Sequence, residues 1–232
     1  MRIAIISDIH SNLEALQAVL SEAKILGYDE LICLGDIIGY GPDPEACLDI
    51  VFDNAKMIVK GNHEHAIVHP ESLNRFNIYA RETILWTIEN ISEKYFRFLS
   101  YLKYDYSKDN VLYVHGSPTD FDQWNYISNY HDASKYFSLM NEALCFVGHS
   151  HIEGIYKEDD YKPFSAENKT IINIGSVGQP RDRKPEASFG IFDTEKWTYM
   201  NYRVKYDINK TREKIIDNKL PLFLSDRLFK GI

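Results

Sequence analysis

Residues 1–16 of the chain, MRIAIISDIHSNLEAL, place a short apolar run directly before two side chains that can bind a metal ion. The run from Ile3 to Ser7 is rich in β-branched residues, which is typical of a strand buried on both faces. Asp8 and His10 follow this run. Because side chains alternate along a strand, residues two positions apart can face the same side, so this carboxylate and this imidazole can share one ion.

The residues that follow alternate between helix and strand patterns. Ser11–Glu14 has the spacing of a capping box, and apolar residues at helical spacing predict a helix that stops at Gly27. Further strands are predicted over residues 30–34 and 56–60, and a helix between them opens at Asp43–Pro44. This alternation favours an α/β fold in which parallel strands are joined by right-handed crossovers.

The rest of the chain is expected to contain helices first and then more strands. Apolar residues recur at helical spacing between residues 75 and 101 and predict one or two helices there. Strands are predicted over 111–114, 144–147 and 170–174, followed by a hairpin over 187–206 and helices over 208–216 and 220–228. We expect one domain over residues 1–232, with a helical cap at about residues 65–105.

The composition is that of an ordinary globular protein. Of the 232 residues, 44% are hydrophobic and 26% are charged, which provides enough apolar surface for a core. The 26 Lys and Arg residues are outnumbered by 34 Asp and Glu residues, so the net charge is -8. Because an acidic chain without a basic block binds DNA phosphates poorly, we expect no duplex DNA partner.

The sequence favours a cytoplasmic location. The first apolar run is too short for a signal peptide, and no stretch of 18 apolar residues occurs, so we expect no membrane partner. Cys33, Cys47 and Cys145 are odd in number and widely spaced, which argues against a disulfide framework. The oligomeric state is left open by these observations.

Side chains that can bind metal follow five predicted strands, at the sheet edge where open α/β proteins bind ligands. They are Asp8 and His10, Asp36, Asn62 and His63, His115, and His149 and His151. The set combines oxygen and imidazole nitrogen without sulfur, which suits Mn, Fe, Ni, Co or Zn rather than calcium or a thiolate zinc site. So many ligands exceed the needs of one four-coordinate ion and fit two ions that share a carboxylate.

The motifs around these residues resemble those of the calcineurin-like metallophosphoesterases. Five blocks occur in the family's order: D-x-H from Asp8, G-D at Gly35–Asp36, G-N-H-E at Gly61–Glu64, H-G at His115–Gly116 and G-H-S-H at Gly148–His151. The resemblance continues over residues 39–44 and 173–181 and is greatest to the small prokaryotic branch of YfcE-type phosphodiesterases and diadenosine tetraphosphatase relatives. It implies a sandwich of two mixed β-sheets flanked by helices.

The same resemblance implies two divalent metal ions, of which manganese is the first choice. The first ion would be held by Asp8, His10, Asp36 and His151, and the second by Asp36, Asn62, His115 and His149. Asp36 would bridge the ions, and a hydroxide between them would attack phosphorus in line. His63 would act as the general acid that gives a proton to the leaving oxygen.

Three further residues are candidates for substrate binding, and each has an ordinary structural alternative. Asn12 can contact substrate or cap a helix, Tyr40 can line the pocket or pack, and Arg181 can bind phosphate or lie on the surface. The remaining histidines, His65, His69 and His131, lie outside the motif blocks and are expected to have surface or packing roles.

Aromatic residues between the motif blocks also have two possible roles. They are Phe76, Tyr79, Trp86, Trp124 and Tyr126. They can pack in the core, or they can form a cap whose rings stack on a base or another flat group.

The leading hypothesis is a two-metal phosphoesterase that hydrolyses a phosphodiester or a nucleotide polyphosphate. Its partner would be a small phosphorylated substrate. The alternatives are a non-catalytic metal-binding scaffold of the same fold and a phosphomonoesterase that acts on proteins or small molecules. Because His63 and every expected ligand are present, the sequence favours the enzyme.

Overall fold

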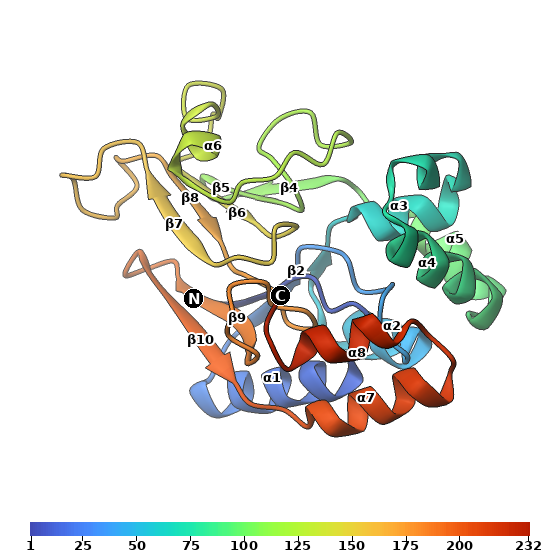
Figure 1. Cartoon of the computed structure of the whole chain (residues 1–232). Coiled ribbons are helices and arrows are strands. Elements are labelled where there is room, and N and C mark those ends of the chain that lie inside the picture. Colours follow the sequence, from blue (N-terminus) through green and yellow to red (C-terminus); the bar gives the residue numbers. More distant parts are fainter.

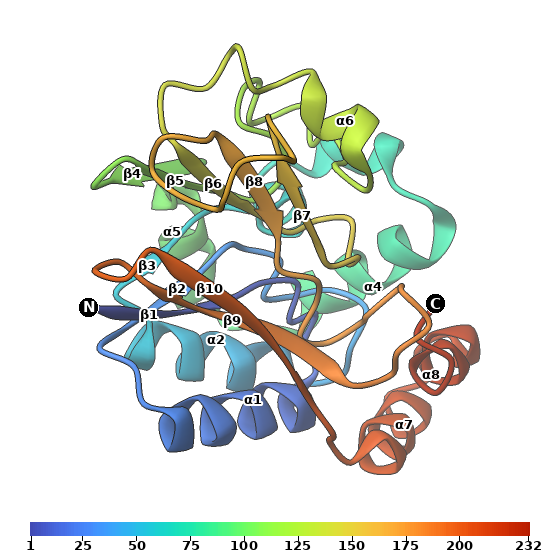
Figure 2. The same cartoon turned by 90° about the vertical axis from the view of Figure 1, so that its left-hand side faces the viewer.

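Two five-stranded β-sheets pack face to face in the computed structural model, which describes residues 1–232 (Figures 1 and 2). The first sheet contains, in spatial order, β10 (Thr198–Val204), β9 (Ala187–Asp193), β1 (Arg2–Ile6), β2 (Glu30–Cys33) and β3 (Met57–Ile58). The second contains β4 (Asp105–Lys108), β5 (Val111–Val114), β6 (Leu144–Val147), β8 (Thr170–Asn173) and β7 (Gly154–Lys157). Each has three adjacent parallel strands and at least one antiparallel edge, so the predicted sandwich of mixed sheets is confirmed.

Helices cover the outer faces of the sandwich. Figure 2 shows α1 (Leu13–Leu26) and α2 (Pro44–Asn54) on the outer face of the first sheet and α6 (Tyr130–Ser134) beyond the second. The chain ends in α7 (Ile208–Asp217) and α8 (Leu222–Leu228), which pack against each other. None of the helices combines the length and the hydropathy that crossing a membrane requires.

The core explains why the first strand is a continuous apolar run. Ile3 and Ile5 of β1 belong to the cluster between the sheets, together with Phe146 of β6. Ala4 and Ile6 point the other way, into the cluster beneath α1 and α2. Both faces of β1 are therefore buried, as the sequence predicts.

The helical segment 62–101 lies between β3 and β4. It contains α3 (Asn62–Val68), a short 3-10 helix (Pro70–Arg75), α4 (Ile78–Asn90) and α5 (Glu93–Tyr101). Figure 1 shows these helices gathered beside the sandwich, at one end of both sheets. The segment falls where the sequence predicts a helical cap.

The predicted capping box at Ser11–Glu14 is wrong by one residue. The N-cap of α1 is Asn12, whose Oδ1 accepts the backbone N–H of Ala15 at 3.2 Å. Ser11 is held in a left-handed conformation and donates its own backbone N–H to Ile37. Glu14 reaches away from the helix end to Lys214, at 2.7 Å.

Candidate metal centre

The chain turns sharply at the ends of the central strands. Asp8, His10, Asp36, His149 and His151 all have positive φ, between 50° and 63°. A non-glycine residue in this region costs about 1–3 kcal/mol and persists only where its surroundings fix it. Such turns project successive side chains toward one point instead of along the strand.

These turns overturn the strand-alternation argument for Asp8 and His10. Strand β1 ends at Ile6, so neither residue has strand geometry. The two side chains still converge, because the left-handed turns at both positions redirect the chain after the strand. The side chains of Asp8 and His10 therefore lie close together as expected, but because of the left-handed turns and not because of strand alternation.

Three imidazole rings are locked in the same tautomer. Each donates its Nδ1–H to a backbone carbonyl: His10 to Ile38 at 3.0 Å, His115 to Leu34 at 2.8 Å and His151 to Gln179 at 2.6 Å. Each Nε2 is therefore the nitrogen that is free to bind a metal ion, and a carbonyl partner on the other ring nitrogen is the usual arrangement of metal-binding histidines.

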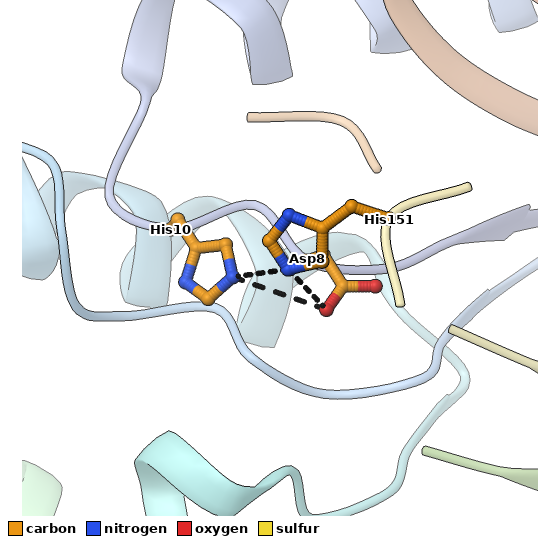
Figure 3. A group of neighbouring side chains, drawn as sticks. All are labelled: Asp8, His10 and His151. Atoms are coloured by element: carbon orange, nitrogen blue, oxygen red, sulfur yellow. Dashed lines mark hydrogen bonds and ion pairs between the residues drawn. The ribbon is translucent and has the colours of Figure 1, made fainter. Parts of the chain in front are cut away.

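The free nitrogens converge in pairs. Nε2 of His10 lies 3.0 Å from Nε2 of His151, and Figure 3 shows both atoms directed at the carboxylate of Asp8. Nε2 of His115 lies 3.1 Å from Nδ1 of His149. Each pair brings two ring nitrogens close enough together to bind one cation.

Each of the two aspartates anchors one oxygen and leaves the other free. Oδ2 of Asp8 accepts the backbone N–H of His149 at 3.0 Å, whereas its buried Oδ1 has no hydrogen-bond partner. That Oδ1 lies 3.2 Å from Nε2 of His151 and 3.9 Å from Nε2 of His10. A buried carboxylate oxygen without a donor fits a metal ligand.

Asp36 lies between two groups of histidines. Its Oδ2 is 3.2 Å from Nε2 of His115 and 3.8 Å from Nε2 of His10. Oδ1 of Asn62 is 3.2 Å from the same His115 nitrogen. All seven expected ligands therefore meet at one edge of the sheets.

Three groups of donor atoms are close enough to hold a metal ion, each with all atoms within 4.8 Å of one another. They are Asp8, His10 and His151; Asp36, His115 and His149; and His10, Asp36 and His63. Each of the first two contains three of the four ligands that we expected for one ion. The third shows that the ring of His63 also lies within reach of a bound ion.

The histidines hold the carboxylates in their charged form. Burial raises the pKa of Asp8, but the charges of His151 and His115 outweigh it, so the pKa falls well below its ordinary value. Burial lowers the pKa of His115, but Asp36 and Asp8 outweigh it and raise the pKa to about 9. Asp8 and Asp36 thus stay negatively charged in a buried site, and their charge favours the binding of cations there.

His63 is the second residue of α3, not part of an extended chain. The helix begins at Asn62, so Asn62 and His63 leave the backbone from consecutive positions of its first turn. Gly61 has φ -92, a value open to any residue. Glycine is needed because a Cβ there would collide with Oδ1 of Asp36.

The ring of His63 packs tightly among its neighbours. Its Nδ1 is buried without a hydrogen-bond partner, and its Nε2 lies 3.9 Å from Oδ2 of Asp36. Gly39 has φ 85, and a Cβ at that position would collide with Nδ1 of His63. The ring of Tyr40 lies 4.9 Å away, and burial lowers the pKa of His63 to about 4.

Glu64 is a structural part of the site that we did not expect from the sequence. Its Oε2 accepts backbone N–H groups from Asp36 at 2.7 Å and Gly61 at 2.9 Å. Its Oε1 accepts those of Ile37 at 2.8 Å and Ile38 at 3.3 Å. The carboxylate thus joins two ligand loops, and the signal for it was an acidic residue three positions after the helix N-cap.

A pocket of about 450 Å³ opens on these residues. Tyr40 and Arg181 line it with Asp36, Asn62 and His63, so two of the three candidate substrate contacts face this space. Asn12 does not line it. The Asn12 side chain caps α1 and donates to the carbonyl of Gly178 at 2.9 Å.

Aromatic residues divide between the pocket and the packing around it. Phe76, Trp124 and Tyr126 line the pocket, and the Tyr126 ring stacks on His149 at 4.1 Å. Tyr79 stacks on Phe223, and Trp86 packs against α7 and α8.

Of the three remaining histidines, His65, His69 and His131, only His65 lines the pocket. Its ring stacks on that of His69 at 4.5 Å, whereas His131 is exposed on α6.

Comparison with known proteins places the chain in a family. Residues 1–197 match the calcineurin-like phosphoesterase superfamily domain, and the chain belongs to this superfamily. The uncharacterized protein MJ0912 of Methanocaldococcus jannaschii is 41% identical over 242 residues, which cover 99% of this chain and 98% of that protein.

Solved structures agree with this assignment. The crystal structure of a metallophosphoesterase from Sphaerobacter thermophilus matches with a TM-score of 0.89 and 37% identity, over 100% of this chain and 99% of that chain. An archaeal phosphodiesterase shares the fold, with a TM-score of 0.50 and 16% identity over 88% of this chain and 100% of its own. The predicted family and fold are confirmed.

Proposed function

We propose that this chain binds two divalent metal ions, with manganese preferred, and hydrolyses a phosphodiester or a nucleotide polyphosphate. The observation that carries the proposal is the set of three locked imidazoles of His10, His115 and His151, whose Nε2 atoms converge on two carboxylates. Membership of the phosphoesterase superfamily supports the same chemistry.

Two ion sites would share Asp36. Asp8, His10 and His151 would complete the first, and Asn62, His115 and His149 the second. When bound, divalent ions supply positive charge to phosphate oxygens and a water nucleophile at neutral pH. Asp36 suits the shared role because its free Oδ2 faces histidines of both groups.

His63 would donate a proton to the leaving oxygen. Its ring lines the pocket and makes no hydrogen bond to another side chain, which leaves Nε2 available to substrate. Because burial lowers its pKa, the ring needs an anionic group beside it to hold the proton, and a bound phosphoester provides one.

The pocket favours a small phosphorylated substrate with a flat group. Its volume of about 450 Å³ lies within the usual range of ligand pockets, roughly 300–1,000 Å³. Trp124, Tyr126 and Phe76 offer aromatic surface on which a base can stack. We propose a cytoplasmic role, on the grounds of the sequence.

A substrate panel tests the proposal. Metal-free protein is supplied in turn with Mn, Ni, Fe and Zn and assayed on p-nitrophenyl phosphate, bis(p-nitrophenyl) phosphate, diadenosine tetraphosphate and cyclic nucleotides. We expect a higher kcat/KM on the bis ester or the tetraphosphate than on the monoester. A uniform preference for monoesters would contradict the substrate class, and metal binding without hydrolysis would favour the scaffold.

A further inference from the structure

Arg181 stands in the wall of the pocket, beside a metal-binding histidine. Its backbone N–H donates to the carbonyl of His151 at 3.1 Å, which fixes where the side chain begins. The side chain lines the pocket together with His63, His151 and Tyr126. A cation is therefore built into the inner pocket in addition to any metal.

The charge of Arg181 has no acidic partner in the protein. Its Nη2 donates to the neutral amide oxygen of Gln179, at 2.9 Å, and the neutral phenol of Tyr126 lies close to the guanidinium. Its Nε is buried and has no partner. Because a guanidinium carries five N–H donors, most of its donors are left for a ligand.

The nearby carboxylates are already paired with other cations. Asp182, the next residue, pairs with Arg203. Glu153 pairs with Arg203 at 3.0 Å and with Lys184 at 2.6 Å. Asp182 and Glu153 therefore form ion pairs with Arg203 and Lys184 and do not neutralise the charge of Arg181.

Neighbouring groups hold the guanidinium in place and add positive charge. It lies over the ring of Tyr40, 5.9 Å from the ring centre. Burial lowers the pKa of Arg227 to about 10, and the nearby charge of Arg181 contributes to this shift. Arg227 does not line the pocket, and it donates through Nε to the carbonyl of Ile232. It therefore strengthens the positive field without competing for the ligand.

We propose that Arg181 binds a second phosphoryl group of the substrate, next to the one that is attacked. This inference rests on the proposed function and selects between its two substrate classes. The attacked phosphoryl belongs at the ligand cluster, whereas the planar fork of Arg181 suits two oxygens of a neighbouring phosphoryl. The favoured substrate contains a diphosphate or polyphosphate linkage, and a simple diester leaves Arg181 unpaired.

The test compares Arg181→Gln and Arg181→Lys with wild type. Diadenosine tetraphosphate offers a second phosphoryl group, and bis(p-nitrophenyl) phosphate does not. A charge-assisted hydrogen bond contributes about 1.5–3 kcal/mol, so we expect kcat/KM on the tetraphosphate to fall roughly 10–150-fold in the glutamine variant. The loss on the bis ester should be at least tenfold smaller, and lysine should restore part of the activity.

Arg183→Gln is the matched control. It removes the same charge two residues further along the same loop, at an exposed position outside the pocket, and should leave both activities unchanged. Equal losses on both substrates would overturn the proposal, because they would place Arg181 at the attacked phosphoryl or in support of His151. No loss on either substrate would overturn it as well.

A binding measurement separates this proposal from the proposed function. Calorimetry in the presence of Mn compares inorganic pyrophosphate with inorganic phosphate for each variant. We expect Arg181→Gln to weaken pyrophosphate at least tenfold more than phosphate. If the wild type hydrolyses no substrate, the proposed function fails, and this comparison still decides the role of Arg181. Equal weakening of both anions would contradict that role.

Discussion

Oδ1 of Asp36 accepts the backbone N–H of His63 at 2.9 Å, and this bond ties the proposed shared metal ligand to the proposed proton donor. The other oxygen of the same carboxylate faces His115 and His10. One side chain thus sets the distance between the metal cluster and the start of α3. A change at Asp36 should therefore affect both ion sites.

Asp36→Ala should lower metal content more than the loss of any ligand that belongs to one site. His10→Ala and His149→Ala are the matched controls, because each removes a ligand from only one of the two proposed ion sites. Metal analysis by mass spectrometry after dialysis gives the ion count per chain. Equal stoichiometry in the three variants would show that Asp36 is not shared.

Replacing His63 should reduce the rate and spare the metal. We expect His63→Ala to lose roughly 10²–10⁴-fold in rate, because a positioned proton donor contributes about that much. The loss should be smaller for p-nitrophenolate, which leaves without a proton, than for an alkoxide leaving group. Loss of metal would instead make His63 a ligand, as its place near His10 and Asp36 allows. If His63→Ala kept both its metal content and its rate on an alkoxide leaving group, His63 would not be the general acid.

Gly39→Ala should act through the ring of His63. The new Cβ collides with Nδ1 of that ring, so the ring must move away from the cluster. Gly27→Ala is the control, because Gly27 also has positive φ but its Cβ would meet only the Arg2 side chain, at 3.5 Å. Both variants should lose at least about 1–2 kcal/mol of unfolding free energy because alanine is strained at positive φ, and the collision adds to the loss at Gly39. Only the change at Gly39 should lower kcat, by tenfold or more; equal rates in the two variants would count against the packing argument.

Glu64→Gln should destabilise the fold and weaken metal binding. An amide supplies one oxygen where the carboxylate supplies two, so two of the four backbone N–H groups lose their acceptor. The free energy of unfolding should fall by at least about 1–3 kcal/mol in chemical denaturation. Glu71→Gln is the control, because the side chain of Glu71 is 76% exposed and should change stability by less than about 0.5 kcal/mol. A Glu64 variant as stable as this control would mean that the N–H groups find other partners.

The sequence predicts the architecture and the identity of the clustered residues, because both follow from local patterns. An apolar strand that ends in Asp, Asn or His can be recognised along the chain, and parallel strands bring those ends together. The short edge strands β4 and β7 were missed, because their exposed or half-buried residues carry no clear alternation. Strand β3 is limited to Met57–Ile58, within the longer predicted run.

The geometry inside the site depends on contacts between distant segments, which local patterns do not contain. The tautomer of His115 is set by the carbonyl of Leu34, 81 residues earlier. Asn12 caps α1 because the turn at Ser11 withdraws that residue from the helix end. The role of Glu64 requires the loop at Asp36 to approach α3. These relationships appear only once the chain is folded.

Titration of metal-free protein with Mn²⁺ tests the central claim most directly, with bound ions, melting temperature and hydrolysis of bis(p-nitrophenyl) phosphate followed in the same samples. We expect two ions to bind per chain, the melting temperature to rise through preferential binding to the folded state, and activity to follow the second ion. Saturation at one ion, or full activity in the rigorously metal-free protein, would contradict the two-metal site.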